Sequence, residues 1–405
     1  MATVTVGATA RRNLDASIGK AAARIESIDF VRGVAMVLMA IDHVRVYSGL
    51  PAGGPTYGIF FTRWVTHFVA PAFVFLAGTA AFLHARRLPD IGALSRFLFT
   101  RGAWLVVLEL TVIRVMWTFN FDFAQYMLAG VIWMIGCCMM LMAALVYLPV
   151  RAIGILGVAL IALHNLTDLL GLQQAFGDDG PHWLLKVLYL GGGFQIGGDG
   201  PPLLVLFVIV PWIGVMMAGY AFGMVMVMPP DRRRSICLRM GAAATALFVV
   251  LRALNVYGDP RPWSADGRMP ALLSFLNTTK YPASLSFLLM TLGPMLLLMG
   301  WSERWRGRMV EVTATFGRVP MFYYLLHIPV IHVAAVLVSL IREGRVNPWL
   351  FGNHPMAPPP VPDGYGWSLW LLYLVFAMCV FVLYFPCRWF ARVRATRSSP
   401  WLSYL

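Results

Sequence analysis

Residues able to carry chemistry are concentrated in one apolar stretch, Arg24 to Tyr47, which reads RIESIDFVRGVAMVLMAIDHVRVY. An α-helix over this stretch places Asp29, Arg32 and His43 on one face, because their spacing follows the helical repeat. At about 1.5 Å of rise per residue, Arg32 and His43 are roughly 16 Å apart along the axis. One face therefore carries a cation near one membrane surface and a proton-handling histidine, next to Asp42 in sequence, near the other. Ionisable groups in hydrocarbon are costly, so we interpret this segment as functional rather than as a simple anchor.

Two further apolar stretches contain histidine and arginine. In FFTRWVTHFVAPAFVFLAG, Arg63 and His67 are four residues apart and share a helical face. In FGRVPMFYYLLHIPVIH, Arg318 lies near the inner surface and His327 near the middle of the membrane. Interfacial anchoring explains such arginines, and a hydrogen bond to a neighbouring helix explains such histidines. The functional alternative is that Arg32 and Arg318 together bind an anion such as a phosphate group.

Other ionisable residues leave both structural and functional interpretations open. Glu109, in LVVLELTVIR, is a functional candidate by its position in an apolar segment, and a structural ion pair is equally consistent. His164 and Asp168 are spaced as a helical pair. The motifs GxxxxGK[ST], GxSxG and HExxH do not occur in the sequence. Histidines stand singly and the five cysteines follow no zinc-site or disulfide pattern, so we expect no metal.

The elements that must position these residues are transmembrane helices. Of 405 residues, 59% are hydrophobic and 12% are charged, against about 25% charged in soluble domains. Repeated apolar runs of about 20 residues predict an all-α polytopic membrane protein with about ten transmembrane helices in one bundle. The expected spans are 28–48, 60–84, 101–118, 127–148, 152–171, 202–228, 238–256, 281–300, 315–341 and 367–388.

The domain organisation is a single membrane domain, over residues 25–390, between two short tails. Residues 1–24 have no apolar core and are interpreted as a cytoplasmic tail rather than a signal peptide, and residues 391–405 form a second cytoplasmic tail. Arginines concentrate in alternate loops, which places those loops and both termini in the cytoplasm. The same loops account for most of the net charge of +14, so we expect the lipid bilayer and not nucleic acid as a partner.

The motif RIESIDFVRGVAMVLMAIDH resembles the opening of the heparan-α-glucosaminide N-acetyltransferase catalytic-domain family. The wider group of transmembrane acyltransferases shares an opening of the form LDxLRGxA…H. The resemblance continues along nearly the whole chain, through FFTRWVTHFVAPAFVFLAG, TRGAWLVVLELTVIR, PWIGVMMAGYAFG, KYPASLSFLLMTLGP, FGRVPMFYYLLHIPVIH and the closing WLSYL. These motifs are similar to the bacterial branch of the family.

The resemblance implies a transmembrane acyltransferase in the bacterial cytoplasmic (inner) membrane. It would take an acyl group, usually acetyl, from cytosolic acetyl-CoA and pass it to an acceptor on the far side. The acceptor class is a sugar, or an amine, of the cell envelope, and the formation of a homo-oligomer stays open. Arg32, with Arg318, would hold the CoA phosphates, and Asp29 belongs to the same inner group.

For the chemistry, the histidine that ends the wider group's opening motif corresponds to His43. It would act as the general base or as a transient acyl carrier. The animal lysosomal enzyme departs from this, since its active-site histidine lies between helices one and two, where residues 54–57 stand here. His67 is therefore the second candidate, and His67 or His327 is the expected partner of His43. Asp42 is also a candidate, although an ideal helix points it away from His43.

Two other functions compete with the acyltransferase. A proton-coupled secondary transporter of a small polar solute would also use intramembrane Glu109, scattered histidines and helices broken by proline. A scaffold that keeps the fold without catalysis would bind no acyl-CoA and would tolerate changes at Arg32 and His43.

Overall fold

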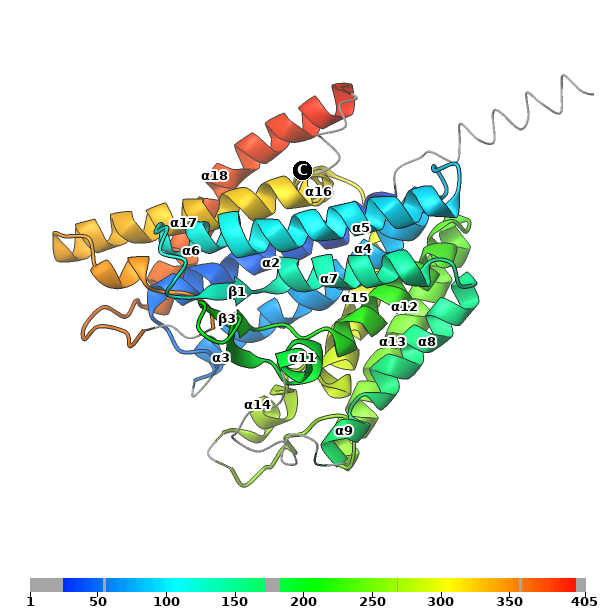
Figure 1. The fold of residues 1–405 in the computed structure, drawn as a ribbon, viewed down its shortest axis with the longest axis horizontal. Helices are drawn as coiled ribbons and strands as arrows, with labels where there is room; N and C mark the ends of the chain where they lie inside the picture. The colour runs from blue at the N-terminus through cyan, green and yellow to red at the C-terminus, as the bar shows by residue number, and fades with distance from the viewer. Residues whose placement is uncertain are drawn as a thin grey trace, which may run out of the picture.

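The computed structural model describes residues 25–53, 56–169, 171, 183–267, 269–356 and 359–397. It is predominantly helical, with one small sheet (Figure 1). The predicted tail 1–24 and the motif WLSYL lie outside the described residues.

The central element is α2 (Glu26–Ser48), the helix expected to carry the chemistry. It packs against α4, α15, α16, α17 and α18, and Ala40 and Val44 are fully buried within this surround (Figure 1). The helix ends where Gly49 adopts a left-handed conformation (φ 72°), which a glycine takes without a steric penalty. The other long helices are α4 (Val69–Ala85), α5 (Ile91–Leu108), α7 (Val131–Leu145), α8 (Val150–Leu163), α12 (Val210–Met226), α13 (Pro230–Leu254), α15 (Leu285–Ser302), α16 (Arg308–Arg318), α17 (Pro320–Glu343) and α18 (Leu369–Thr396).

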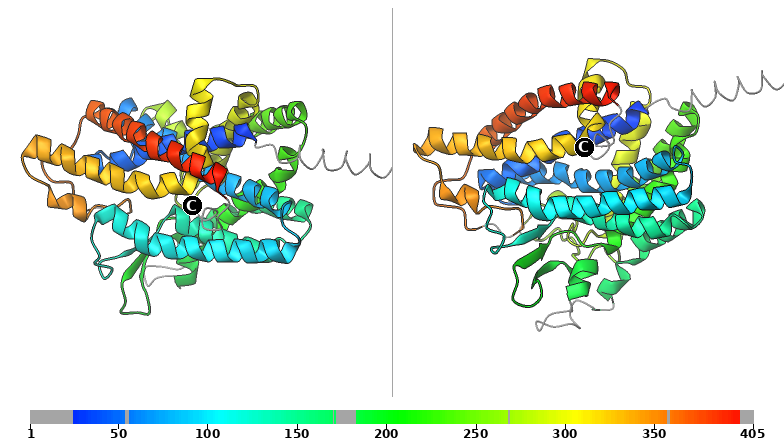
Figure 2. Two further views of the ribbon diagram at one scale, coloured as in Figure 1. Left: turned by 90° about the horizontal axis from the view of Figure 1, so that it is seen from above. Right: turned by 45° about the horizontal axis from the view of Figure 1, so that its top comes forward.

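Helices stand at all the expected positions, and several meet the length and hydropathy needed to cross a bilayer. Within the described residues, six helical segments are long and apolar enough, and two more, α7 and α12, are apolar but shorter. The protein is therefore a multi-pass membrane protein, while a total of about ten crossings stays a prediction. Long helices run side by side in this bundle, and α18 lies obliquely across α17 (Figure 2).

The expected ninth span, 315–341, was wrong as one helix. The chain forms α16, which ends at Arg318, and α17, which begins at Pro320. Between them Val319 leaves the helical region (φ −131°, ψ 55°), because the ring of a proline disfavours helical geometry in the preceding residue. Pro320 itself is favourable in the first turn of α17, where no helical partner for its nitrogen is needed.

The third span also differs from its expected limits of 101–118. Its helix begins ten residues earlier, at Ile91, where the side chain of Asp90 accepts a hydrogen bond from the nitrogen of Ala93 (2.7 Å). It continues from α5 through a π-helical turn, η2 (Glu109–Ile113), into α6 (Arg114–Thr118). The π turn contains Glu109, the one carboxylate of this segment.

A three-stranded sheet corrects the starts of the fourth and sixth spans. Residues expected at 127 and 202 to enter helices instead form β1 (Met127–Ala129) and β3 (Pro202–Val205), which pair in parallel, and β2 (Gly192–Gln195) pairs antiparallel with β3. The strands end before Gly130 and Ile209, where α7 and α12 begin. Apolar runs this short do not distinguish a buried strand from a helix.

The remaining short elements are α3 (Tyr57–Trp64), η1 (Val65–Phe68), α9 (Leu166–Leu169), α11 (Trp183–Leu185), η3 (Lys186–Leu190), α14 (Ala271–Leu276) and η4 (Pro348–Phe351).

The backbones of α2 and α16 approach each other closely at two glycines. A Cβ atom at Gly33 would lie 1.9 Å from the carbonyl oxygen of Thr313, and one at Gly317 would lie 1.9 Å from the carbonyl oxygen of Asp29. Each helix therefore contributes a glycine where the other passes. Small residues at such crossings let two membrane helices approach closely.

We expect Gly33→Ala to lower the free energy of unfolding by about 2 kcal/mol or more, because the new methyl group must push two backbones apart. Thermal unfolding of the detergent-purified protein measures the effect. Gly267→Ala is the matched control, since a Cβ atom there meets nothing within 4 Å. Equal unfolding temperatures for the two variants would contradict this contact.

Candidate active site

A cavity of ≈100 Å³ opens beside the C-terminal half of α2. Its lining comes from α2, the α3–α4 segment, the α5–α6 segment, α17 and the loops at that end of the bundle. The lining residues are Met39, Asp42, His43, Arg45, Arg63, Thr66, Val69, Ala70, Glu109, Trp117, Leu128, Gly130, Val131, Leu206, Phe207, Lys280, Tyr281, Tyr324 and Pro355.

His43 and His327 are in direct contact at this cavity. Nδ1 of His43 lies 2.6 Å from Nε2 of His327, and the two rings are stacked. Nδ1 of His327 lies 2.6 Å from the carbonyl oxygen of Tyr324. A carbonyl oxygen only accepts, so Nδ1 of His327 carries a proton and its neutral ring presents a lone pair at Nε2. His43 must then donate from Nδ1, which assigns the lone pair of its neutral ring to Nε2.

This arrangement leaves the Nε2 lone pair of His43 free to accept a proton. Within the described part of the chain, Nε2 of His43 has no hydrogen-bond partner, and His43 lines the cavity. The edge of its ring packs against Trp117, with ring centroids 4.8 Å apart, which holds the imidazole in place. A proton taken up at Nε2 would be shared through the chain of hydrogen bonds to His327 and the carbonyl oxygen of Tyr324.

Asp42 does not contact His43, although both line the cavity. Its Oδ1 accepts a hydrogen bond from Nε of Arg45 (2.9 Å), one helical turn further along α2. Arg45 also donates to the carbonyl oxygen of Leu50. Asp42 is therefore part of the charged lining of the cavity, and the ring of His43 is oriented by His327 instead.

His67 is buried near the cavity but is not joined to His43. It lies in η1, the 3₁₀ turn between α3 and α4, and packs against Phe287. Both of its ring nitrogens are buried and have no hydrogen-bond partner among the described residues. Thr66 and Ala70 on either side of it line the cavity, whereas His67 faces the protein interior. Of the two partners expected for His43, the structure brings His327 into contact and not His67.

Glu109 caps a helix and forms no ion pair with any of the residues that the structure describes. Its Oε2 accepts hydrogen bonds from the backbone nitrogens of Ile132 (2.9 Å) and Trp133 (3.3 Å) in the first turn of α7. These nitrogens have no partner within α7, and a carboxylate is favourable at the positive end of a helix. Gly130 admits the carboxylate, because a Cβ atom there would lie 2.6 Å from Oε1. Arg114, the nearby cation in the same segment, instead donates to carbonyl and amide oxygens of the following loop.

The inner group of predicted residues also comes together. Nη1 of Arg32 lies 3.9 Å from Oδ1 of Asp29 and donates to the carbonyl oxygen of Gly317 (3.3 Å). The next residue, Arg318, ends α16, and its Nε is buried without a partner in the described part of the chain. Arg394, from α18, donates to the carbonyl oxygen of Arg318. Arg318 therefore directly follows Gly317, the residue whose carbonyl oxygen accepts from Arg32, and Asp29 lies one turn before Gly33.

The loop after α17 also contributes to the wall of the cavity. Nδ2 of Asn353 donates to the carbonyl oxygen of Val46 (2.8 Å), and Pro355 lines the cavity. His354 between them is buried, and burial together with the charge of Arg114 lowers its pKa to about 4. A neutral His354 packs in this loop without adding to the positive charge of the site.

Lys280 lines the cavity but was not among the site residues predicted from the sequence. It precedes α15 and lines the cavity together with Arg63. Its signal is weak, because a lysine next to an apolar helix more often anchors that helix at the membrane surface.

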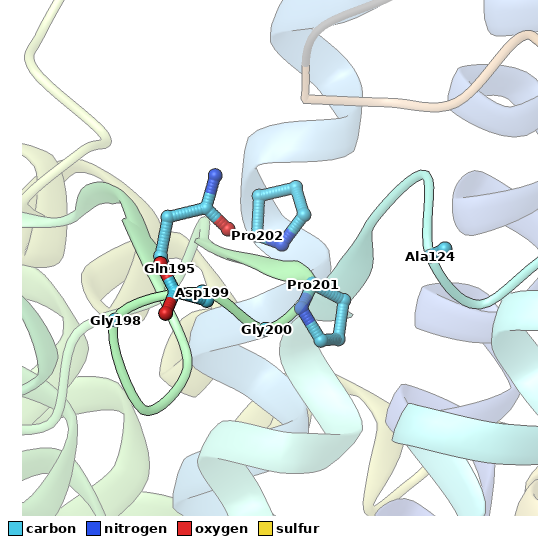
Figure 3. Close-up of a pocket in the computed structure, with 7 residues that line it drawn as sticks. All are labelled: Ala124, Gln195, Gly198, Asp199, Gly200, Pro201 and Pro202. Atoms are coloured by element: carbon cyan, nitrogen blue, oxygen red, sulfur yellow. The ribbon is translucent and has the colours of Figure 1, made fainter.

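A larger hollow of ≈470 Å³ lies among the outer loops, apart from these residues (Figure 3). The hairpin between β2 and β3 forms one side, and Ala124 stands across from it (Figure 3). None of the predicted site residues lines it. Its polar side chains are Gln195 and Asp199, and its lining includes no histidine or arginine. No group of three or more potential metal ligands is found in the described part of the chain.

Comparison with known protein families identifies the family of this chain. A family model described as heparan-alpha-glucosaminide N-acetyltransferase, catalytic, matches residues 24–257. The chain belongs to this N-acetyltransferase family. The match includes α2 with Arg32 and His43, while Arg318 and His327 lie beyond it, so the resemblance of the later motifs stays a prediction. No curated protein matches the chain.

We expect Glu109→Ala to destabilise the protein by about 2 kcal/mol, because two buried nitrogens of α7 lose a charged acceptor. Glu109→Gln should lose less, since the amide oxygen can still accept. Thermal unfolding of both variants provides the comparison. If instead Glu109→Gln and Glu109→Ala are equally destabilised, the cap does not explain the residue.

Proposed function

We propose that the protein is a membrane acetyltransferase that moves an acetyl group from acetyl-CoA to a sugar or amine acceptor of the cell envelope. The observation that carries the proposal is the hydrogen-bonded chain from His43 through His327 to Tyr324, in a chain of an N-acetyltransferase family. The chain of bonds supports a base at Nε2 of His43, on the wall of a cavity able to admit an acceptor group.

The proposed reaction begins with the acceptor nitrogen or oxygen next to Nε2 of His43. The acceptor atom attacks the thioester carbonyl carbon, and its proton passes to Nε2. The carbon–sulfur bond then breaks, and the sulfur of CoA leaves and takes up the proton from Nε2, which regenerates the base. His327 is a positioning residue, because it touches His43 and not the reacting atoms. Its lone pair at Nε2 accepts from Nδ1 of His43 and stabilises the imidazolium formed during the step.

The donor is proposed to enter from the opposite end of α2. Arg32 and Arg318 lie on neighbouring helices there, and we propose that their guanidinium groups bind the phosphates of acetyl-CoA. Asp29 holds Arg32 in place and limits the net positive charge of the inner group. The pantetheine arm of CoA is an extended chain, suited to reach along α2 toward His43.

The membrane and the orientation are part of the same proposal. Arginine-rich loops face the cytoplasm, together with both termini, and the membrane is the bacterial inner membrane. Residues 25–390 form the membrane domain between the two tails. Acetyl-CoA is available on the cytoplasmic side, where this orientation places Arg32 and Arg318.

The transporter alternative loses its main support in the structure. It used Glu109 as an intramembrane proton carrier, and both nitrogens at the start of α7 engage that carboxylate. A proton carrier must exchange its proton during each cycle, and protonation here would weaken a buried helix cap.

The test separates donor binding from chemistry. Arg32→Ala should weaken acetyl-CoA binding about tenfold, because a charged hydrogen bond to phosphate is lost, while His43→Ala should bind acetyl-CoA as the wild type does. Calorimetry on detergent-purified protein measures both. Arg151→Ala, an exposed arginine, is the matched control. Failure of the folded wild type to bind acetyl-CoA would refute the proposal.

Chemistry is tested by acetylation of glucosamine as a probe acceptor. His43→Ala should lower kcat by about 10²- to 10⁴-fold, the contribution of a general base. His327→Ala should lower kcat about tenfold or more with little change in KM, because the ring of His43 loses the group that fixes its proton at Nδ1. His327→Gln keeps an acceptor oxygen and should recover part of the rate. Wild-type kcat in His327→Ala would show that the contact has no role in orienting His43.

A further inference from the structure

Positively charged side chains outnumber negatively charged ones in the lining of the cavity. Asp42 is the carboxylate that faces the cations there, and its charge interacts with Arg45, Lys280 and Arg63. Glu109 also lines the cavity, but its Oε2 is bound to the backbone of α7. Three cations thus share one acidic partner, and Arg45 takes the direct contact with Asp42, at 2.9 Å.

Arg63 and Lys280 are left without a close acidic partner. In the described part of the chain neither side chain forms an ion pair or a hydrogen bond, although Lys280 is only 8% exposed. The ammonium group of Lys280 instead lies over the rings of Tyr281 and Phe207, 5.2 and 5.9 Å from their centroids. A cation buried in this way is costly unless an anion joins it.

The backbone of Lys280 is held rigidly in this position. The carboxylate of Asp259 accepts from the nitrogen and hydroxyl of Thr279, the preceding residue. Nε2 of His164 donates to the carbonyl oxygen of Ala283 (2.8 Å). Asn165 accepts from the nitrogen of Leu285. Such support from outside the site fixes a binding group before its ligand arrives.

Arg63 approaches the cavity from a different element. It lies in the last turn of α3, directly before η1, and the carbonyl oxygen of Arg63 accepts from the hydroxyl of Thr66 (2.6 Å). The two cations therefore come from different elements and line the same cavity as His43. A guanidinium and an ammonium group in one cavity suit a carboxylate, sulfate or phosphate group.

We propose that Arg63 and Lys280 form an anion subsite, so that the acceptor carries a carboxylate, sulfate or phosphate group beside the atom to be acetylated. This inference rests on the proposed function, since the subsite selects the acceptor for His43. An anion at the subsite would also offset the repulsion between Lys280 and the proton that His43 takes up.

The experiment measures binding without acetyl-CoA. Glucuronate and glucose 6-phosphate are titrated into detergent-purified protein at constant ionic strength, with glucose as the neutral probe and inorganic phosphate as the free anion. Wild type should bind both anionic sugars at least about tenfold more tightly than glucose, the effect of a charged hydrogen bond. Arg63→Gln/Lys280→Gln should lose this preference. Lys186→Gln, which changes a half-buried lysine outside the cavity lining, should keep it.

Further variants separate the outcomes. Lys280→Arg preserves the charge and should bind anionic sugars nearly as the wild type does. Acetyl-CoA binding by Arg63→Gln/Lys280→Gln shows that its loss of preference is not a folding defect. The proposal is overturned if glucose binds as tightly as the anionic sugars, if the double variant keeps the preference, or if only nanodiscs of phosphatidylglycerol compete at the site. Acetyl-CoA binding, measured separately, stays intact in all three cases if the proposed function holds.

Discussion

The structure depends on how closely α2 approaches the α16–α17 segment. At one end of the contact, Gly33 and Gly317 let the two backbones meet, and no larger residue fits at either position. The direction of α17 is then set by the break at Val319, which Pro320 imposes. From that starting point α17 runs along α2 and delivers His327 to His43. A steric constraint near one end of α2 thus determines a hydrogen bond near its other end.

Inside a membrane domain the cost of burial governs which polar groups are tolerated. Glu109 is retained because the first turn of α7 needs an acceptor, and Asp42 because Arg45 lies one turn away. His43 is oriented by a neutral partner, so the site gains no extra buried charge. Arg63 and Lys280 are the exception, because they line the cavity without a close carboxylate. These two cations are the basis of the proposed preference for an anion.

The two ends of α2 are suited to different tasks. Arginines gather at the end near α16, where Asp29 and the carbonyl oxygen of Gly317 hold Arg32. Imidazole rings, a tryptophan and the cavity lie at the other end. Phosphate recognition needs fixed positive charge, whereas proton transfer needs a lone pair in a site with little water. Separating the two along one helix keeps Arg32 away from His43, while Asp42 offsets the nearer charge of Arg45.

The sequence by itself determined the class of protein, the positions of most helices, and the face of α2 that carries Arg32 and His43, because these follow from composition and from short-range periodicity. It also led to the family. Only the tertiary structure decided that His327 and not His67 contacts His43, since the two residues are 284 positions apart and their meeting depends on helix packing. The role of Glu109 depended in the same way on a helix 23 residues further along the chain. Lys280 escaped detection because its segment reads as a membrane anchor, and only folding turns it toward the cavity.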